Sequence, residues 1–132
     1  MKLSTRGRYG LMAMSHLANN YGGGPLSVNY IAEKEGLSVA YLEQLFSRLK
    51  KRNLVKSIRG AQGGYVLTEP PEKIAIGDVI EALEGELAFS CCSSEEGHNC
   101  DRGRDCSAKT ILDRIQEEVD DVLYSMTLED MR

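Results

Sequence analysis

The sequence predicts a mainly α-helical protein that carries one small β-hairpin. Apolar residues recur at helical spacing along most of the 132 residues, and two short β-prone runs flank a single glycine-rich turn. A chain of this length can form one modest hydrophobic core. We therefore expect a small helical fold whose one hairpin is a local addition.

Three helices are expected in the first half of the chain. Leu11, Met14, Leu17 and Ala18 recur at helical spacing in a helix from Thr5 to about Asn20, and the sequence Gly-Gly-Gly-Pro at 22–25 ends it. Two further helices follow, each with a serine at its predicted N-cap.

Ser27 is expected to cap the second helix, and Gly36 to end it. Ser38 caps a third helix that runs to about Arg52, so the turn at residues 35–38 contains a glycine. Two helices joined by such a turn form a helix-turn-helix. The β-prone runs at 54–58 and 65–67 come directly afterwards, and this order of elements predicts a winged helix-turn-helix over residues 1–70.

The second half, residues 71–132, is expected to hold a short helix, a cysteine loop and a long helix. Pro70-Pro71 suggests a linker, a helix begins near Ile76 and ends at Gly85, and the loop covers about 88–106. The long helix, at about 107–126, has one apolar stripe, and residues 127–130 form a capping-box pattern. The stripe either packs on its own core or pairs with its copy. We favour dimerisation, because helix-turn-helix proteins commonly bind two half-sites as dimers.

Charge is divided unevenly along the chain. Residues 1–66 hold ten Lys and Arg against three acids, a net charge of +7, whereas residues 67–132 hold six against seventeen, a net charge of −11. A basic half of this kind predicts contact with a polyanion, and double-stranded DNA is the leading partner.

The four cysteines of the chain are Cys91, Cys92, Cys100 and Cys106, and they lie within sixteen residues. The surrounding segment is polar, so these thiols are not expected to be buried for packing. Structural disulfides are disfavoured, because no signal peptide precedes them and two of the cysteines are adjacent. Thiolates are ligands for zinc and for iron–sulfur clusters. Structural zinc sites usually show close cysteine pairs, so the spacing favours an iron–sulfur cluster.

Long stretches of the sequence resemble a known family. Residues 2–10 (KLSTRGRYG), 41–45 (YLEQL) and 55–65 (VKSIRGAQGGY), with shorter matches at 76–80 and 127–130, look like the Rrf2 family of bacterial transcription regulators. Within it, the cysteine loop is most similar to the iron–sulfur cluster regulators. The resemblance implies a homodimeric winged-helix repressor or activator that carries a 2Fe–2S cluster, senses iron–sulfur supply and controls cluster-assembly genes.

The resemblance also implies the ligands. Cys92, Cys100 and Cys106 match the family's thiolate positions, and the cluster would be delivered by the iron–sulfur assembly machinery. The family's fourth ligand is a histidine three residues after the last cysteine, where this sequence has Lys109. The fourth ligand is then Cys91, His98 or a carboxylate such as Glu95, and Cys91 or Cys92 can be the first.

Two other branches of the family remain as alternatives. Some nitric-oxide sensors use an acidic residue near position 8, where this chain has Arg8. The cysteine-metabolism regulators resemble the first 85 residues but lack the cysteine loop. A zinc-stabilised DNA-binding protein is the alternative outside these branches.

DNA contacts are expected from the third helix, the hairpin tip and scattered basic residues. Gln44 can bond adenine bidentately and Glu43 can accept from cytosine N4, and the resemblance implies that Glu43 discriminates between two classes of site. Arg59 suits a narrow minor groove, with Gly60, Gly63 and Gly64 allowing close approach. The full set adds Ser38, Ala40, Tyr41 and Arg48, and the phosphate contacts Arg6, Arg8, Lys50, Lys51, Arg52 and Lys56.

Other functions find little support. The sequence shows no nucleophile–base pairing and no phosphate-binding loop, so we expect no enzymatic activity. His16, on the first helix, is expected to be structural. With no signal peptide and no membrane-spanning apolar stretch, we expect a cytoplasmic protein without membrane contact.

Overall fold

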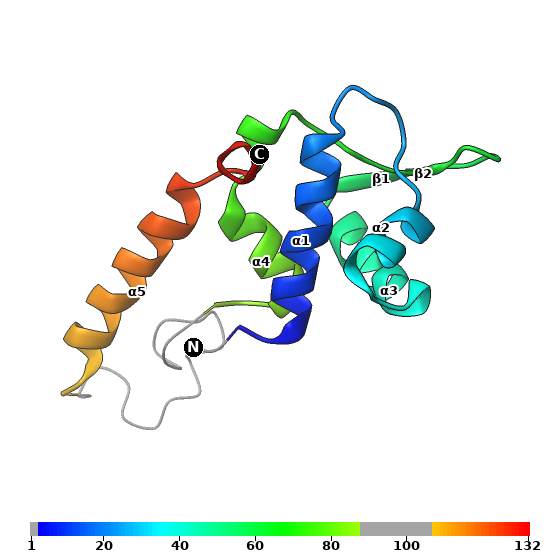
Figure 1. The fold of residues 1–132 in the computed structure, drawn as a ribbon. Helices are drawn as coiled ribbons and strands as arrows, with labels where there is room; N and C mark the ends of the chain where they lie inside the picture. Colours follow the sequence, from blue (N-terminus) through cyan, green and yellow to red (C-terminus); the bar gives the residue numbers. More distant parts are fainter. Residues whose placement is uncertain (1–2, 88–106) are drawn as a thin grey trace.

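A computed structural model describes residues 3–87 and 107–132 of the chain. It confirms the expected fold class, mainly helical with one two-stranded antiparallel hairpin (Figure 1). The elements in order are α1 (Thr5–Asn19), α2 (Val28–Glu35), α3 (Val39–Lys51), β1 (Val55–Ile58), β2 (Gly64–Leu67), the 3-10 turn η1 (Pro71–Lys73), α4 (Ile76–Glu84), α5 (Lys109–Ser125) and the 3-10 turn η4 (Leu128–Met131).

Local signals in the sequence start and stop the first three helices. The hydroxyls of Ser27 and Ser38 accept hydrogen bonds from the backbone N–H groups of Tyr30 and Tyr41, as expected of N-caps. Gly36 ends α2 with φ of 66°, in the left-handed region that favours glycine. The helix-turn-helix is therefore built from short-range interactions.

The core is one cluster that joins both halves of the chain. It contains side chains of α1, α2, α3, both strands and α4, together with Leu123 and Leu128 near the C-terminus. Helix α4 lies against α1 at Gly10, where an added Cβ would fall 2.2 Å from a methyl carbon of the fully buried Leu83. Packing continues across the predicted boundary near residue 70. The assignment of DNA binding to one side of it and dimerisation to the other therefore stays a prediction.

The segment before α4 differs from the expected linker. Pro71 is fully buried and begins η1, so this stretch packs on the core. Two backbone bonds tie the C-terminus to it: the N–H of Ile76 donates to the carbonyl of Met126 at 2.9 Å, and the N–H of Leu128 donates to the carbonyl of Ile74 at 3.0 Å. The sequence signal was misleading because a proline pair can be held in place by residues distant in sequence.

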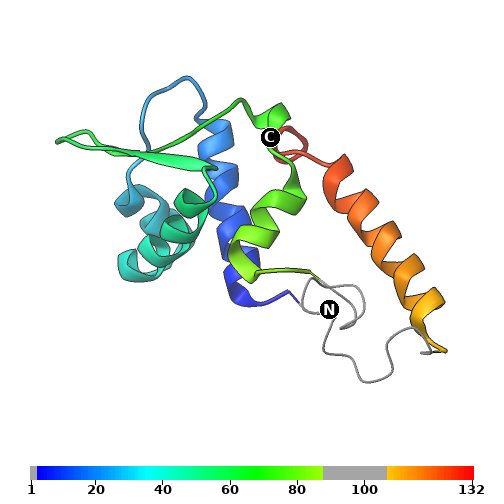
Figure 2. The ribbon, with the colours of Figure 1, turned by 180° about the vertical axis from the view of Figure 1, so that it is seen from behind.

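Helix α5 extends away from the rest of the molecule, as Figures 1 and 2 show from opposite sides. Near its C-terminal end, Leu123 is buried and the Tyr124 hydroxyl donates to Glu81 of α4 at 2.9 Å. Ile111 and Val122 are 66% and 55% exposed. The predicted apolar stripe is thus only partly covered by the chain's own core. Among the described residues, no helix is long and apolar enough to cross a membrane.

Candidate nucleic-acid interface

Helix α3 divides its residues between core and solvent. Leu42, Leu45, Phe46 and Leu49 are buried at the spacing expected of one helical face. The opposite face exposes Ala40, Glu43, Gln44, Arg48, Lys50 and Lys51. The buried stripe fixes the orientation of the helix, so its polar face is presented to solvent as a rigid unit.

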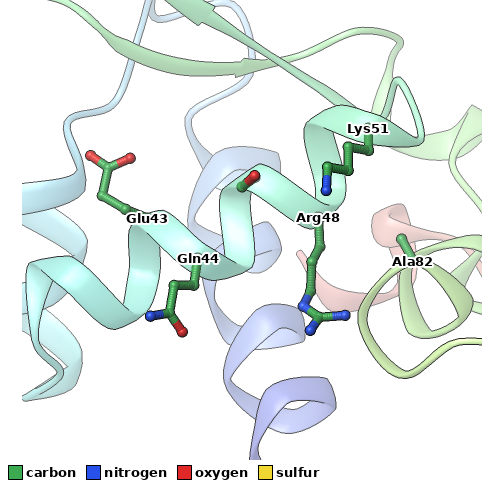
Figure 3. A pocket seen from close by; sticks show the side chains of 6 residues that line it. Glu43, Gln44, Arg48, Lys51 and Ala82 are labelled. Atoms are coloured by element: carbon green, nitrogen blue, oxygen red, sulfur yellow. The ribbon is translucent and has the colours of Figure 1, made fainter.

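A groove runs along this polar face. We call it the helix groove, and it is lined by Glu43, Gln44, Ser47, Arg48, Lys51 and Ala82. Gln44 and Arg48, four residues apart, point to the same side of α3 (Figure 3). An amide and a guanidinium are the groups that read base edges in the major groove, and lysine binds phosphate. The groove therefore combines groups suited to bases and to the DNA backbone.

The hairpin places Arg59 and Gly60 at an exposed tip. Its strands pair from Val55 opposite Leu67 to Ile58 opposite Gly64. Gly60 has φ of 124°, which L side chains rarely adopt. The hairpin is anchored by two hydrogen bonds between Leu26 and Tyr65, of 2.9 and 3.0 Å. It is a fixed extension beside α3, as a wing requires.

Gly63 and Gly64 are needed within the protein itself. A Cβ at Gly64 would lie 2.2 Å from the carbonyl oxygen of Leu26, and one at Gly63 would lie 2.3 Å from that of Ile58. The sequence predicts that both glycines allow close approach of DNA. The neighbouring backbone atoms leave no room for a side chain at either position, so both glycines are required whether or not DNA is bound.

A second groove, the wing groove, lies between the hairpin and the starts of α2 and α3. Its lining includes Asn29, Val39, Arg59 and Tyr65, and Glu43 lines it as well as the helix groove. The Tyr65 hydroxyl donates to Glu43 Oε2 at 3.1 Å. Burial, and then the charge of Glu43, raise the pKa of Tyr65. No sequence signal indicates this contact, because the residues lie 22 positions apart in different elements.

The residues predicted to contact DNA are all exposed, except for the half-buried Tyr41, Gly63 and Gly64. Several already have partners in the protein. Lys50 Nζ donates to Ser57 Oγ at 3.1 Å, Arg52 lies 3.9 Å from Glu81, and the Arg8 guanidinium lies 5.6 Å from the centre of the Tyr9 ring. Their contacts with DNA remain predictions that this exposure allows.

Glu84 links the start of α1 to the end of α4, a contact between distant residues for which the sequence carries no signal. Its Oε1 accepts from the backbone N–H groups of Ser4 and Gly7 at 2.9 Å each, and from the Ser4 hydroxyl. Burial alone would raise the pKa of this carboxyl, but these hydrogen bonds and the nearby Arg6 together lower it. Tyr41 reaches the same end of α1, since its hydroxyl donates to Thr5 at 3.4 Å.

The predicted cluster ligands Cys91, Cys92, Cys100 and Cys106, with His98 and Glu95, lie outside the described residues. Lys109, in the position of the family's histidine, begins α5 and pairs with Asp113 in its first turn. His16 Nε2 lies 2.6 Å from Glu35, so it links α1 to α2 as a structural residue. In the ranges 3–87 and 107–132, no group of three or more His, Cys, Asp or Glu could hold a metal ion.

Comparisons with known proteins agree with this architecture. The profile of the Rrf2 family, described as iron-dependent transcriptional regulators, matches residues 3–132. The transcriptional regulator CymR of Bacillus subtilis (strain 168) is 46% identical over 132 residues, which cover 99% of this chain and 89% of that protein. A solved structure of B. subtilis CymR, described as its global cysteine regulator, has a TM-score of 0.80 at 44% identity, covering 99% of this chain and 95% of that one.

Regulators named IscR are also similar. That of Pectobacterium carotovorum subsp. carotovorum (strain PC1) is 38% identical over 131 residues, which cover 99% of this chain and 79% of that protein. The structure of T. potens IscR has a TM-score of 0.77 at 44% identity, covering 99% of this chain and 85% of that one. The family match spans nearly the whole chain, so the protein belongs to the Rrf2 family of transcriptional regulators.

Proposed function

We propose that this regulator binds specific DNA sequences and senses iron–sulfur cluster status through a cluster of its own, thereby controlling cluster-assembly genes. The observation that carries the proposal is the group of four cysteines within sixteen residues, between α4 and α5. Soft thiolates gathered in a polar segment are suited to such a cluster. The family's description as iron-dependent supports the same conclusion.

The donor set fits an iron–sulfur cluster, most simply a 2Fe–2S cluster, with three thiolates from Cys92, Cys100 and Cys106. Cys91, His98 or Glu95 would complete it. Lys109 would not, because its ammonium has no lone pair to donate and pairs with Asp113. When bound, the cluster supplies a redox-sensitive crosslink within the loop. Because the thiols must lose their protons to bind it, cluster loading releases protons and depends on pH.

DNA binding is assigned to the helix groove, the hairpin tip and the neighbouring basic residues. Dimerisation is assigned to α5, whose exposed Ile111 and Val122 leave apolar surface for a second copy. In a dimer, the α3 recognition helices of the two copies would read two half-sites. This function would place the protein in the cytoplasm, bound to DNA. The iron–sulfur assembly machinery would deliver its cluster.

Anaerobic purification tests the proposal directly. The protein should be brown, with visible charge-transfer absorption, and should contain iron and sulfide in a fixed ratio to the chain. Footprints of the apo and cluster-bound forms should then differ at one or more promoters. A colourless zinc-containing protein, or identical footprints for the two forms at every promoter, would contradict iron–sulfur sensing.

A second candidate is a regulator of cysteine metabolism. The 46% identity to B. subtilis CymR and the fold shared with that global cysteine regulator favour it. A regulator of this kind should bind its DNA sites with undiminished affinity when no metal centre is present. Replacing all three of Cys92, Cys100 and Cys106 by serine separates the two candidates, since only the cluster-sensing regulator should change its promoter occupancy.

A further inference from the structure

We infer that Tyr65 is a positioning residue that holds the carboxylate of Glu43 in place and thereby sets the base preference of α3. The inference rests on the proposed DNA-binding function. It deepens that function by assigning part of the sequence specificity to a side chain of the wing, which lies outside the recognition helix.

Tyr65 is held so that its hydroxyl is a fixed point. Its ring stacks on Phe46, with centroids 4.4 Å apart and planes 7° from parallel, and Phe46 is fully buried. Its backbone N–H and carbonyl both bond to Leu26, at 2.9 and 3.0 Å. A hydroxyl on a ring fixed from two sides has little freedom to move.

Glu43 is placed where its orientation matters. It is exposed on α3 and lines both the helix groove and the wing groove, so a freely rotating carboxylate could turn toward either. The Tyr65 hydroxyl donates to Oε2 at 3.1 Å. This hydrogen bond selects one arrangement of a side chain with three rotatable torsions and leaves Oε1 to accept from another donor.

A carboxylate fixed in this way discriminates between bases. It accepts from the amino groups of cytosine and adenine and repels the acceptor atoms of guanine and thymine. If the carboxylate were loose, it could swing away from a mismatched base, and the penalty for that base would be reduced. Holding a group in its bound orientation before binding therefore strengthens both the match and the rejection.

The Tyr65→Phe substitution separates positioning from structure. Phenylalanine keeps the ring that stacks on Phe46 and the backbone bonds to Leu26, and it loses only the hydroxyl. Tyr124→Phe is the matched control, because it removes a hydroxyl that donates to Glu81 at 2.9 Å outside both grooves. Glu43→Asp is a second test, since it keeps the charge but draws the carboxylate back from Tyr65.

The experiment selects bound sequences from a random-sequence DNA duplex library, using the full-length protein. Wild type should enrich a defined motif. Tyr65→Phe should keep the rest of that motif and its affinity for random duplex. Its preference at the base pair read by Glu43 should fall about tenfold, the low end of what one hydrogen bond to a charged group contributes. Glu43→Asp should lose the same preference, and Tyr124→Phe should select the wild-type motif.

A double substitution completes the test. Glu43→Ala should abolish the preference at that base pair, and adding Tyr65→Phe to it should change nothing further. An unchanged preference in Tyr65→Phe or in Glu43→Asp would overturn the inference while leaving DNA recognition intact. A wild-type protein that enriched no motif would instead overturn the proposed function, and the inference with it.

Discussion

Replacing Glu84 by glutamine tests the contact between the start of α1 and the end of α4. The Glu84 side chain is only 10% exposed, and its Oε1 accepts from two backbone N–H groups at 2.9 Å and from the Ser4 hydroxyl. These N–H groups belong to Ser4 and Gly7, at the positive end of the α1 dipole. Glutamine keeps one acceptor oxygen but loses the negative charge that this end favours.

The expected cost is about 1–2 kcal/mol of unfolding free energy at pH 7. Hydrogen bonds to a charged acceptor contribute about 1.5–3 kcal/mol, and glutamine retains part of this. Arg6, which is 44% exposed and 3.9 Å away, adds little because solvent screens it. A cost of this size lowers the melting temperature by about 3–10 °C in a chain of this length.

The dependence on pH gives the sharper test. The hydrogen bonds lower the folded-state pKa of Glu84 below its ordinary value of 4.5. The carboxylate's contribution is therefore fully present above that value and disappears as the pH falls through the folded-state pKa. Urea unfolding, followed by circular dichroism, gives the free energy of unfolding from pH 7 down to about pH 3. The values for wild type and Glu84→Gln should converge in acid.

Glu33→Gln is the matched control, because Glu33 is exposed on α2. Its effect should stay within about 0.5 kcal/mol at every pH. If the free energies of unfolding of wild type and Glu84→Gln differed by a constant amount down to pH 3, the charge of Glu84 would not be what stabilises the protein. If the two proteins had the same free energy of unfolding at pH 7, the contact would not be stabilising.

Three further predictions test the interface, the assembly and the wing. Lys51→Ala removes a cation from the helix groove, so binding should weaken on all duplexes, and the slope of log affinity against log salt should shrink by about one per contacting protomer. Val122→Asp puts a charge on the exposed apolar face of α5, and light scattering should show the dimer converted to monomer. Gly64→Ala places a Cβ 2.2 Å from the Leu26 carbonyl oxygen, so thermal unfolding should show a loss of about 1–3 kcal/mol.

Each of these predictions has a result that contradicts it. An unchanged salt slope in Lys51→Ala would remove that residue from the DNA contacts. A wild-type monomer, or a Val122→Asp dimer, would move dimerisation away from α5. Wild-type stability in Gly64→Ala would mean that the hairpin can shift from Leu26 without cost.

The helix-turn-helix could be read from the sequence because its signals are local. Ser27 and Ser38 each lie within three residues of the N–H groups they cap, and Gly36 adopts its left-handed conformation at the end of α2. The capping box at Thr127 and Asp130 was predicted and is present for the same reason. Such interactions depend on a few neighbouring residues, so they need no knowledge of the tertiary fold.

Contacts between distant residues were decided by the tertiary structure. Glu84 meets Ser4 across 80 positions, and Tyr65 meets Glu43 across 22, so neither pair leaves a periodic pattern in the sequence. Pro71 read as part of a linker, yet it is buried because the C-terminal segment packs beside it. The sequence alone determined the helices, the wing, the basic half and the cysteine group. Only folding decided which carboxylate caps α1 and which tyrosine contacts Glu43, because these partners are brought together by packing of the core.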